Sequence, residues 1–170
     1  MTRIGFLGAT AFLCCTCLAQ SGRPDFSGNW KLDVGKSSTW KVENGKTSRE
    51  ADQDGDYVQT IQQSATKITV STKAQGVTNV LDGTFPIDGK QHMSTLKPGT
   101  YRFTKVGWDP GNTLVFEIYD KDGKKETSKV IGYVRESWTL SHDGKVLTKS
   151  GKSVEAGKPL FDQKYVLNKQ

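Results

Sequence analysis

The chain has 170 residues, and its 24 lysines and arginines against 18 aspartates and glutamates give a net charge of +6 at pH 7. This length suits one domain with a substantial hydrophobic core. Lysine supplies most of the positive charge and is spread along the chain. The charge therefore predicts a solvated surface and argues against nucleic-acid binding, which favours clustered arginine with exposed aromatic side chains.

Residues 1–19 have the pattern of a secretory signal peptide. Arg3 precedes an uncharged, mostly apolar run over 4–13, and Cys17 and Ala19 occupy the small-residue positions of a cleavage site. We therefore expect a single domain over 20–170 in a secreted or periplasmic protein, with no membrane span in the mature chain. An uncleaved N-terminal anchor is the alternative.

All three cysteines, Cys14, Cys15 and Cys17, lie within the predicted signal. The mature chain would then contain none, which excludes disulfides, cysteine nucleophiles and thiolate metal sites. Because lipoprotein signals end in a cysteine, a protein that is lipid-anchored to the cell envelope is the competing interpretation.

The first half of the mature chain shows short strand patterns separated by polar stretches. Alternating apolar and polar residues predict strands over 27–34, 39–43, 57–63, 67–73, 77–81 and 85–87. In the first of these, Trp30, Leu32 and Val34 share one face. The charged stretch 44–56 is expected to be a long loop, and 91–99 to be irregular.

The second half alternates more strongly. Strands are predicted over 101–106, 113–119, 129–141, 146–148 and 160–167, with a polar, glycine-rich connection over 150–159. The triplet Asp-Gly-Lys occurs at 88–90, 122–124 and 143–145, and Asp-Gly supplies the positive φ angles of tight hairpin turns.

No segment sustains the 3.6-residue apolar period of a helix. The sequence therefore predicts an all-β, antiparallel fold of about eight to ten strands. Up-and-down order favours a β-barrel, and a β-sandwich is the alternative.

Three motifs point to a family. The segment Asp25–Leu32 reads Asp-Phe-Ser-Gly-Asn-Trp-Lys-Leu, Trp108-Asp109 precedes Leu114–Glu117, and Trp138–Thr148 reads Trp-Thr-Leu-Ser-His-Asp-Gly-Lys-Val-Leu-Thr. Together they resemble lipocalin-like (calycin-type) secreted bacterial proteins. The resemblance implies a β-barrel that binds a small apolar or amphipathic ligand. It also implies a basic residue on the last strand packed over the tryptophan, and Lys164 and Lys169 are the candidates.

We interpret Gly28 and Trp30 as structural residues that close one end of the barrel, because a large apolar ring suits a plug better than a binding site. The candidate ligand-binding residues are Glu136, Trp138, Phe116 and Arg102. They are placed mainly on strands whose inner faces line the predicted cavity.

Glu136 shares a strand face with Val134, Trp138 and Leu140. A carboxylate on an apolar face is costly unless it is paired. It either faces the cavity, where it binds a polar headgroup or an internal arginine such as Arg102, or a bulge near Gly132 resets the register and exposes it.

The sequence contains no motif that is typical of a catalytic or metal-binding site. His92 and His142 have no partner at metal-ligand spacing, and no serine lies in a nucleophile-elbow motif. Asp52, Asp54 and Asp56 resemble the start of a calcium loop, but position 63, where a closing glutamate would stand, is Gln63. We expect no enzyme activity, no metal and no cofactor.

These observations predict a monomeric, exported β-barrel that binds or carries a small hydrophobic or amphipathic ligand. The alternative is a cell-envelope interaction or inhibitor protein with a filled core, whose function lies in loops such as 44–56. The two differ in whether the barrel holds a pocket.

Overall fold

The computed structural model describes residues 22–44, 46–49, 56–74, 81–155 and 160–170. The predicted signal peptide, the triplet Asp52–Asp54 and all of the expected strand 77–81 except Leu81 lie outside these residues. The elements of the described chain are β1 (Gly28–Leu32), β2 (Ser38–Glu43), β3 (Lys46–Arg49), β4 (Val58–Gln63), β5 (Lys67–Lys73), β6 (Gly83–Pro86), β7 (Gln91–Lys97), β8 (Thr100–Asp109), β9 (Thr113–Lys121), β10 (Val130–Leu140), β11 (Val146–Glu155) and β12 (Leu160–Lys169).

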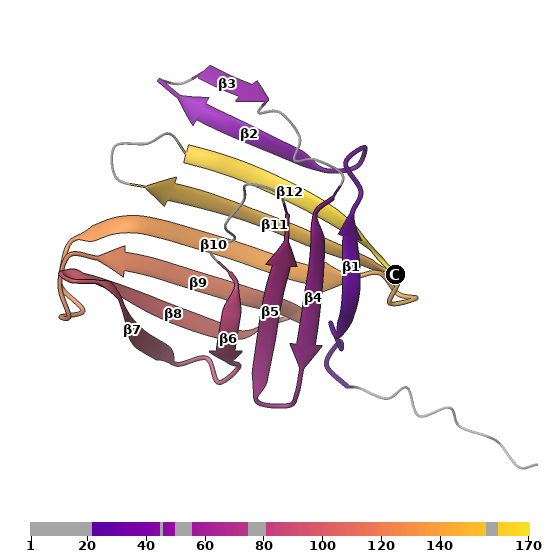
Figure 1. Ribbon diagram of the computed structural model, residues 1–170, viewed down its shortest axis with the longest axis horizontal. Helices are drawn as coiled ribbons and strands as arrows, with labels where there is room; N and C mark the ends of the chain where they lie inside the picture. Colours follow the sequence, from indigo (N-terminus) through magenta and orange to yellow (C-terminus); the bar gives the residue numbers. More distant parts are fainter. Residues whose placement is uncertain (1–21, 45, 50–55, 75–80, 156–159) are drawn as a thin grey trace, which may run out of the picture.

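The strands form one antiparallel sheet that curls through 330° into a half-barrel. Ten strands follow the order β6-β5-β4-β1-β12-β11-β10-β9-β8-β7, and β2 and β3 extend from β12 (Figure 1). The two end strands of this order, β6 and β7, are not hydrogen-bonded to each other, so the sheet has an open seam between them. The predicted all-β, largely up-and-down, barrel-like fold is confirmed, and the two-sheet sandwich is wrong.

The sheet divides where the chain leaves β1. Strand β12 pairs with β1 through Leu167–Lys169 and with β2 through Leu160–Lys164. Between them, the Ser37 hydroxyl donates to the Asp33 carbonyl at 2.7 Å and accepts the Val166 N–H at 3.0 Å, which satisfies the backbone at the bend.

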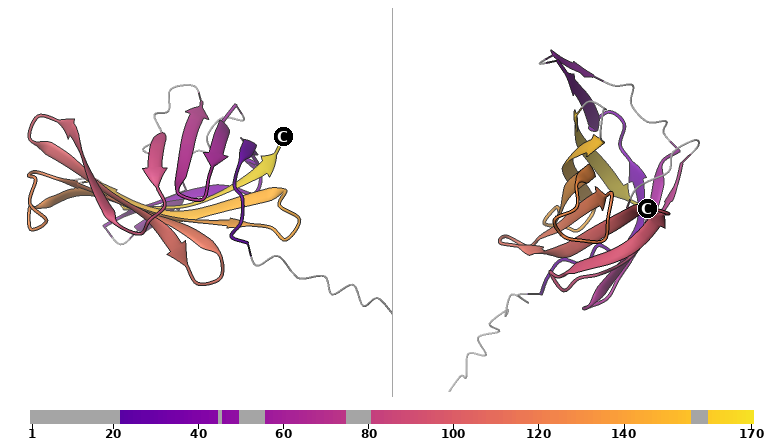
Figure 2. Two further views of the ribbon diagram at one scale, coloured as in Figure 1. Left: turned by 90° about the horizontal axis from the view of Figure 1, so that it is seen from below. Right: turned by 90° about the vertical axis from the view of Figure 1, so that its left-hand side faces the viewer.

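The sheet therefore has two parts that face each other, one of short strands and one of long strands. We call these parts the short wall and the long wall. Strands β4, β5 and β6 stand almost upright on the layer formed by the long strands β8–β12 (Figure 2). The long strands extend well beyond this wall (Figure 1). The candidate site lies in the interior between the two walls.

Three stretches expected to be irregular contain strands. Strand β3 lies within the predicted loop 44–56, β7 within 91–99, and β11 continues to Glu155 inside the predicted connection 150–159. Each of these expectations was wrong for the same reason. These segments lack clear apolar alternation, and β7 is exposed at every position, so backbone pairing with a neighbour defines them instead.

One end of the interior is filled by aromatic rings. Phe26, Trp30, Phe116 and Trp138 are completely buried. The Phe116 and Trp138 ring centroids are 4.6 Å apart, and Phe26 meets Trp138 edge-on at 5.8 Å. Such pairs stabilise a core beyond the apolar area that they bury.

Trp30 is held in this end by two contacts. Its indole N–H donates to the Phe26 carbonyl at 2.8 Å, and the Lys169 amine lies 5.3 Å from the ring centroid. Lys169 is therefore the residue of the last strand that packs over the tryptophan. A side chain at Gly28, where φ is 142°, would meet Lys169 Cε at 2.8 Å, so this position requires glycine.

Candidate functional site

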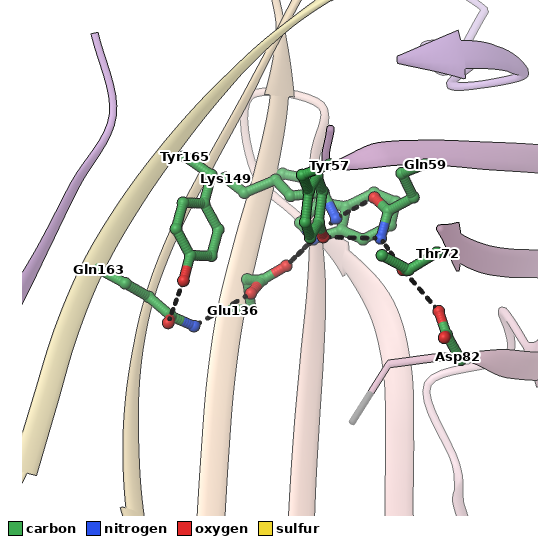
Figure 3. A network of polar contacts seen from close by, with 9 residues as sticks. Tyr57, Gln59, Thr72, Asp82, Glu136, Lys149, Gln163 and Tyr165 are labelled. Atoms are coloured by element: carbon green, nitrogen blue, oxygen red, sulfur yellow. Dashed lines mark hydrogen bonds and ion pairs between the residues drawn. The ribbon is translucent and has the colours of Figure 1, made fainter. Parts of the chain in front are cut away.

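A buried ion pair lies beside the aromatic end of the interior (Figure 3). Lys149 Nζ on β11 is 3.6 Å from Glu136 Oε1 on β10, and the two side chains are 1% and 5% exposed. The lysine amine also donates to Gln59 Oε1 on β4. It lies 3.8 Å from the Trp138 ring centroid, within the range of a cation–π contact.

The strand register brings this pair together. Lys149 is the cross-strand partner of Trp138, and Glu136 is the partner of Gly151. Strand alternation places Glu136 and Trp138 on the same face, and the Trp138 indole N–H donates to Glu136 Oε1 at 2.5 Å. Two neighbouring strands thus supply both charged groups and the Trp138 ring that contacts each of them.

The alternative that a bulge exposes Glu136 is wrong. The β10–β9 register does shift between Val130 and Gly132, but pairing is continuous beyond that point. Glu136 therefore stays on the inner face and is buried. Its expected partner was also wrong, because Arg102 makes two hydrogen bonds to Asp120, at 2.8 and 2.9 Å.

Gln59 carries the network from Lys149 towards the open seam. Its amide N–H groups donate to the Tyr57 hydroxyl at 3.2 Å and to Thr72 Oγ1 at 3.1 Å. The Thr72 hydroxyl donates to Asp82 Oδ1 at 2.6 Å. A continuous polar chain therefore joins the buried amine to a carboxylate at the surface (Figure 3).

On the other side, the network reaches β12. The Gln163 amide donates to Glu136 Oε2 at 3.4 Å, and the Tyr165 hydroxyl donates to Gln163 Oε1 at 3.2 Å. Thr39 on β2 donates to the Tyr165 hydroxyl at 3.4 Å. The network thus spans the interior from β2 to the loop before β6.

Burial lowers the pKa of Lys149 from 10.5 to about 8, and the charge of Glu136 only partly opposes this effect. Burial also raises the pKa of Tyr165. The desolvation of the ammonium thus outweighs the attraction of its counter-ion. Strongly shifted pKa values cluster at functional sites, and buried ion-pair networks produce them as well.

A pocket of about 270 Å³ opens at the seam between β6 and the β7–β8 pair. We call it the seam pocket. Its apolar walls include Phe85, Leu96 and Val106, and its polar groups include Asp82 and Arg102. The Phe85 ring meets Phe116 edge-on at 5.7 Å, so the pocket adjoins the aromatic core directly. Through Asp82 it also joins the polar network.

The structure brings three of the four predicted ligand-binding residues together. Phe116, Trp138 and Glu136 are in one contact group, in which Phe116 lies nearest to the seam pocket. Arg102 lines the pocket itself but is held by Asp120, apart from Glu136.

Sequence reasoning missed Lys149, Gln59 and Asp82. The signal for Lys149 is its place two residues after the buried Leu147 on one strand face. It was missed because the predicted strand ended at 148. Gln59 lies within the predicted strand 57–63 but was not considered as a partner, and Asp82 adjoins a stretch outside the described residues.

The fold and the site define an all-antiparallel, strongly curled β-sheet of barrel type with a buried aromatic cluster. No protein-family model matches the chain, and no curated protein is similar to it at a significant level. The resemblance to lipocalin-like proteins therefore rests on the three sequence motifs, and the structure adds only the strongly curled, all-antiparallel sheet.

Within the described ranges, no group of three or more histidine, cysteine, aspartate or glutamate residues is arranged to hold a metal ion. No helix in that part of the chain is long and apolar enough to cross a membrane. Of the three carboxylates that resemble the start of a calcium loop, the structure describes only Asp56.

Gly151 lies opposite Glu136 on the neighbouring strand and leaves no space for a side chain. A Cβ atom at this position would lie 2.6 Å from the Arg135 carbonyl oxygen and 3.2 Å from Glu136 Cβ. Gly151→Ala should therefore lower the free energy of unfolding by about 1–3 kcal/mol, the usual cost of overpacking. Urea denaturation followed by tryptophan fluorescence measures this change.

Gly35→Ala is the matched control, because the nearest atom to its added Cβ is Asp33 Oδ1 at 3.6 Å, an ordinary contact. We expect its stability to stay within about 0.5 kcal/mol of the wild type. Equal losses in both variants would show that the contact with Glu136 has no special role.

Proposed function

We propose that this protein is an exported, non-enzymatic binding protein that takes a small hydrophobic or amphipathic ligand into the seam pocket. The observation that carries this proposal is the pocket of about 270 Å³ on the inner side of the curled sheet. Its apolar wall adjoins the aromatic core, and its polar side connects to the buried network. Concave sites with mostly apolar walls and a few placed polar groups are typical of ligand binding.

The apolar part of such a ligand would lie against Phe85, Leu96 and Val106. Leu96 is 48% exposed, although it borders the pocket. Covering it removes apolar surface from water, which is favourable by roughly 25 cal/mol per Å². A large exposed apolar side chain beside a cavity thus supports a ligand of this kind.

A filled-core interaction protein is the second candidate. The observation that favours it is the complete burial of Trp30, Phe26, Phe116 and Trp138, which leaves the aromatic end of the interior closed to ligands. The seam pocket lies outside that end, which is why ligand binding remains our first choice.

Titration with N-phenyl-1-naphthylamine, a neutral apolar probe whose fluorescence rises out of water, tests the proposal. We expect saturable binding to the wild type and at least a tenfold weaker affinity for Leu96→Arg, which places a charge at the pocket mouth. Val154→Arg is the matched control, because Val154 is 41% exposed on the opposite face of the sheet. Equal binding by all three proteins, or no binding by the wild type, would reject the seam pocket as the ligand site.

A further inference from the structure

We propose that the seam pocket selects cationic amphiphiles, small molecules with an alkyl chain and an ammonium group that binds to Asp82. This inference rests on the proposed function and names the class of ligand. Asp82 lines the pocket, is exposed, and accepts a hydrogen bond from the Thr72 hydroxyl at 2.6 Å. That bond holds one oxygen of the carboxylate in place at the pocket wall.

Asp82 is the carboxylate among the lining residues of the pocket. Across the described residues, no lysine, arginine or histidine nitrogen lies within 4.0 Å of it. Its charge acts on the buried Lys149, whose pKa it helps to raise against the larger effect of burial, but the two groups form no ion pair. Arg102, which also lines the pocket, binds Asp120 with two hydrogen bonds. The pocket therefore offers a carboxylate that no described cation contacts directly.

The buried amine interacts with Asp82 through its charge but does not contact it. Lys149 is 1% exposed and is already paired with Glu136 and Gln59. An anionic headgroup would meet the Asp82 carboxylate first and would have to displace Asp120 to reach Arg102. An ammonium ion meets an available carboxylate with no such competition.

The apolar walls suit a cation as well as its chain. Phe85 offers an aromatic ring, whose face attracts ammonium groups. The pocket volume of about 270 Å³ is below the usual range for drug-sized ligands, so the ligand is expected to be small.

Calorimetric titration with three six-carbon probes tests the inference: hexylammonium, hexanol and hexanoate. We expect the affinity to fall in that order. In Asp82→Asn, the affinity for hexylammonium should drop roughly tenfold, as expected for the loss of one charge-assisted hydrogen bond, while hexanol is unaffected. Asp88→Asn is the matched control, because Asp88 is a neighbouring exposed carboxylate that does not line this pocket and already contacts His92. It should bind hexylammonium like the wild type.

The outcomes separate the two proposals. If hexanol or hexanoate binds as tightly as hexylammonium, or if Asp82→Asn binds hexylammonium like the wild type, the preference for cations is wrong while ligand binding stands. If none of the three probes binds, both proposals are wrong. Thermal melting of Asp82→Asn verifies that it is folded, which we expect because Asp82 is exposed.

Discussion

Replacing Lys149 with methionine is expected to lower the free energy of unfolding by about 3–5 kcal/mol at pH 7. Methionine keeps much of the length and apolar surface of the lysine side chain but has no N–H groups. The main change is therefore the loss of the donor to Gln59 and Glu136, which even a neutral lysine would still supply. The Glu136 carboxylate would then be buried with only the Trp138 indole and the Gln163 amide as donors. Urea denaturation at pH 7 measures the loss.

The double variant Lys149→Met, Glu136→Gln separates this effect from a loss of packing. Its glutamine keeps an acceptor for the Trp138 indole but removes the uncompensated charge. We expect the double variant to recover at least half of the stability lost in the single variant, because removing both partners of a buried pair costs far less than removing one. Additive losses would show instead that the two side chains contribute independently.

An ion pair with these properties is a poor choice for stability alone. The lowered pKa of Lys149 means that the folded state disfavours the charged amine, even with Glu136 3.6 Å away. The pair lies between the aromatic core and the polar chain that leads through Gln59 to Asp82. This position links the charge state of the interior to the pocket where we propose that a ligand binds.

The fold could be predicted from short-range patterns where these are strong. Strand β5 was predicted with its observed bounds, 67–73, because Ile68 and Val70 alternate with polar residues and both are buried. Strand β7 could not be predicted, because all of its residues are exposed and its only partner in the described chain is β8. The open seam depends on how all the strands pair, so the residue pattern within a single strand does not predict it.

The candidate site could be predicted only in part. Alternation along β10 placed Glu136 on the inner face with Trp138, but the partner of the carboxylate depends on the β10–β11 register, which brings Lys149 opposite Trp138. Arg102 was named as an example of an internal arginine that could pair with Glu136. In the structure Asp120 is its direct cross-strand neighbour and binds it instead.

Raising the pH from 8 to 10.5 should stabilise the wild type relative to Lys149→Met by about 3 kcal/mol, because a shift of one pKa unit corresponds to about 1.4 kcal/mol. The folded pKa of Lys149, about 8, is below the value of 10.5 expected for the unfolded chain. Between these two values the unfolded chain binds more protons, so the free energy of unfolding rises with pH across this window. Below pH 8 both states are protonated, and the full cost of the buried charge is present.

The comparison with Lys149→Met removes the other groups that titrate in this range. Burial raises the pKa values of Tyr133 and Tyr165 in the folded protein, which lowers stability as the pH rises through 10. Both tyrosines are present in the wild type and in the variant, so their effect cancels in the difference. Urea denaturation of the two proteins at half-unit steps from pH 7 to 10.5 gives that difference directly. A difference that does not change with pH would mean that Lys149 titrates at its ordinary pKa, and the buried amine could then not link proton binding to the seam pocket.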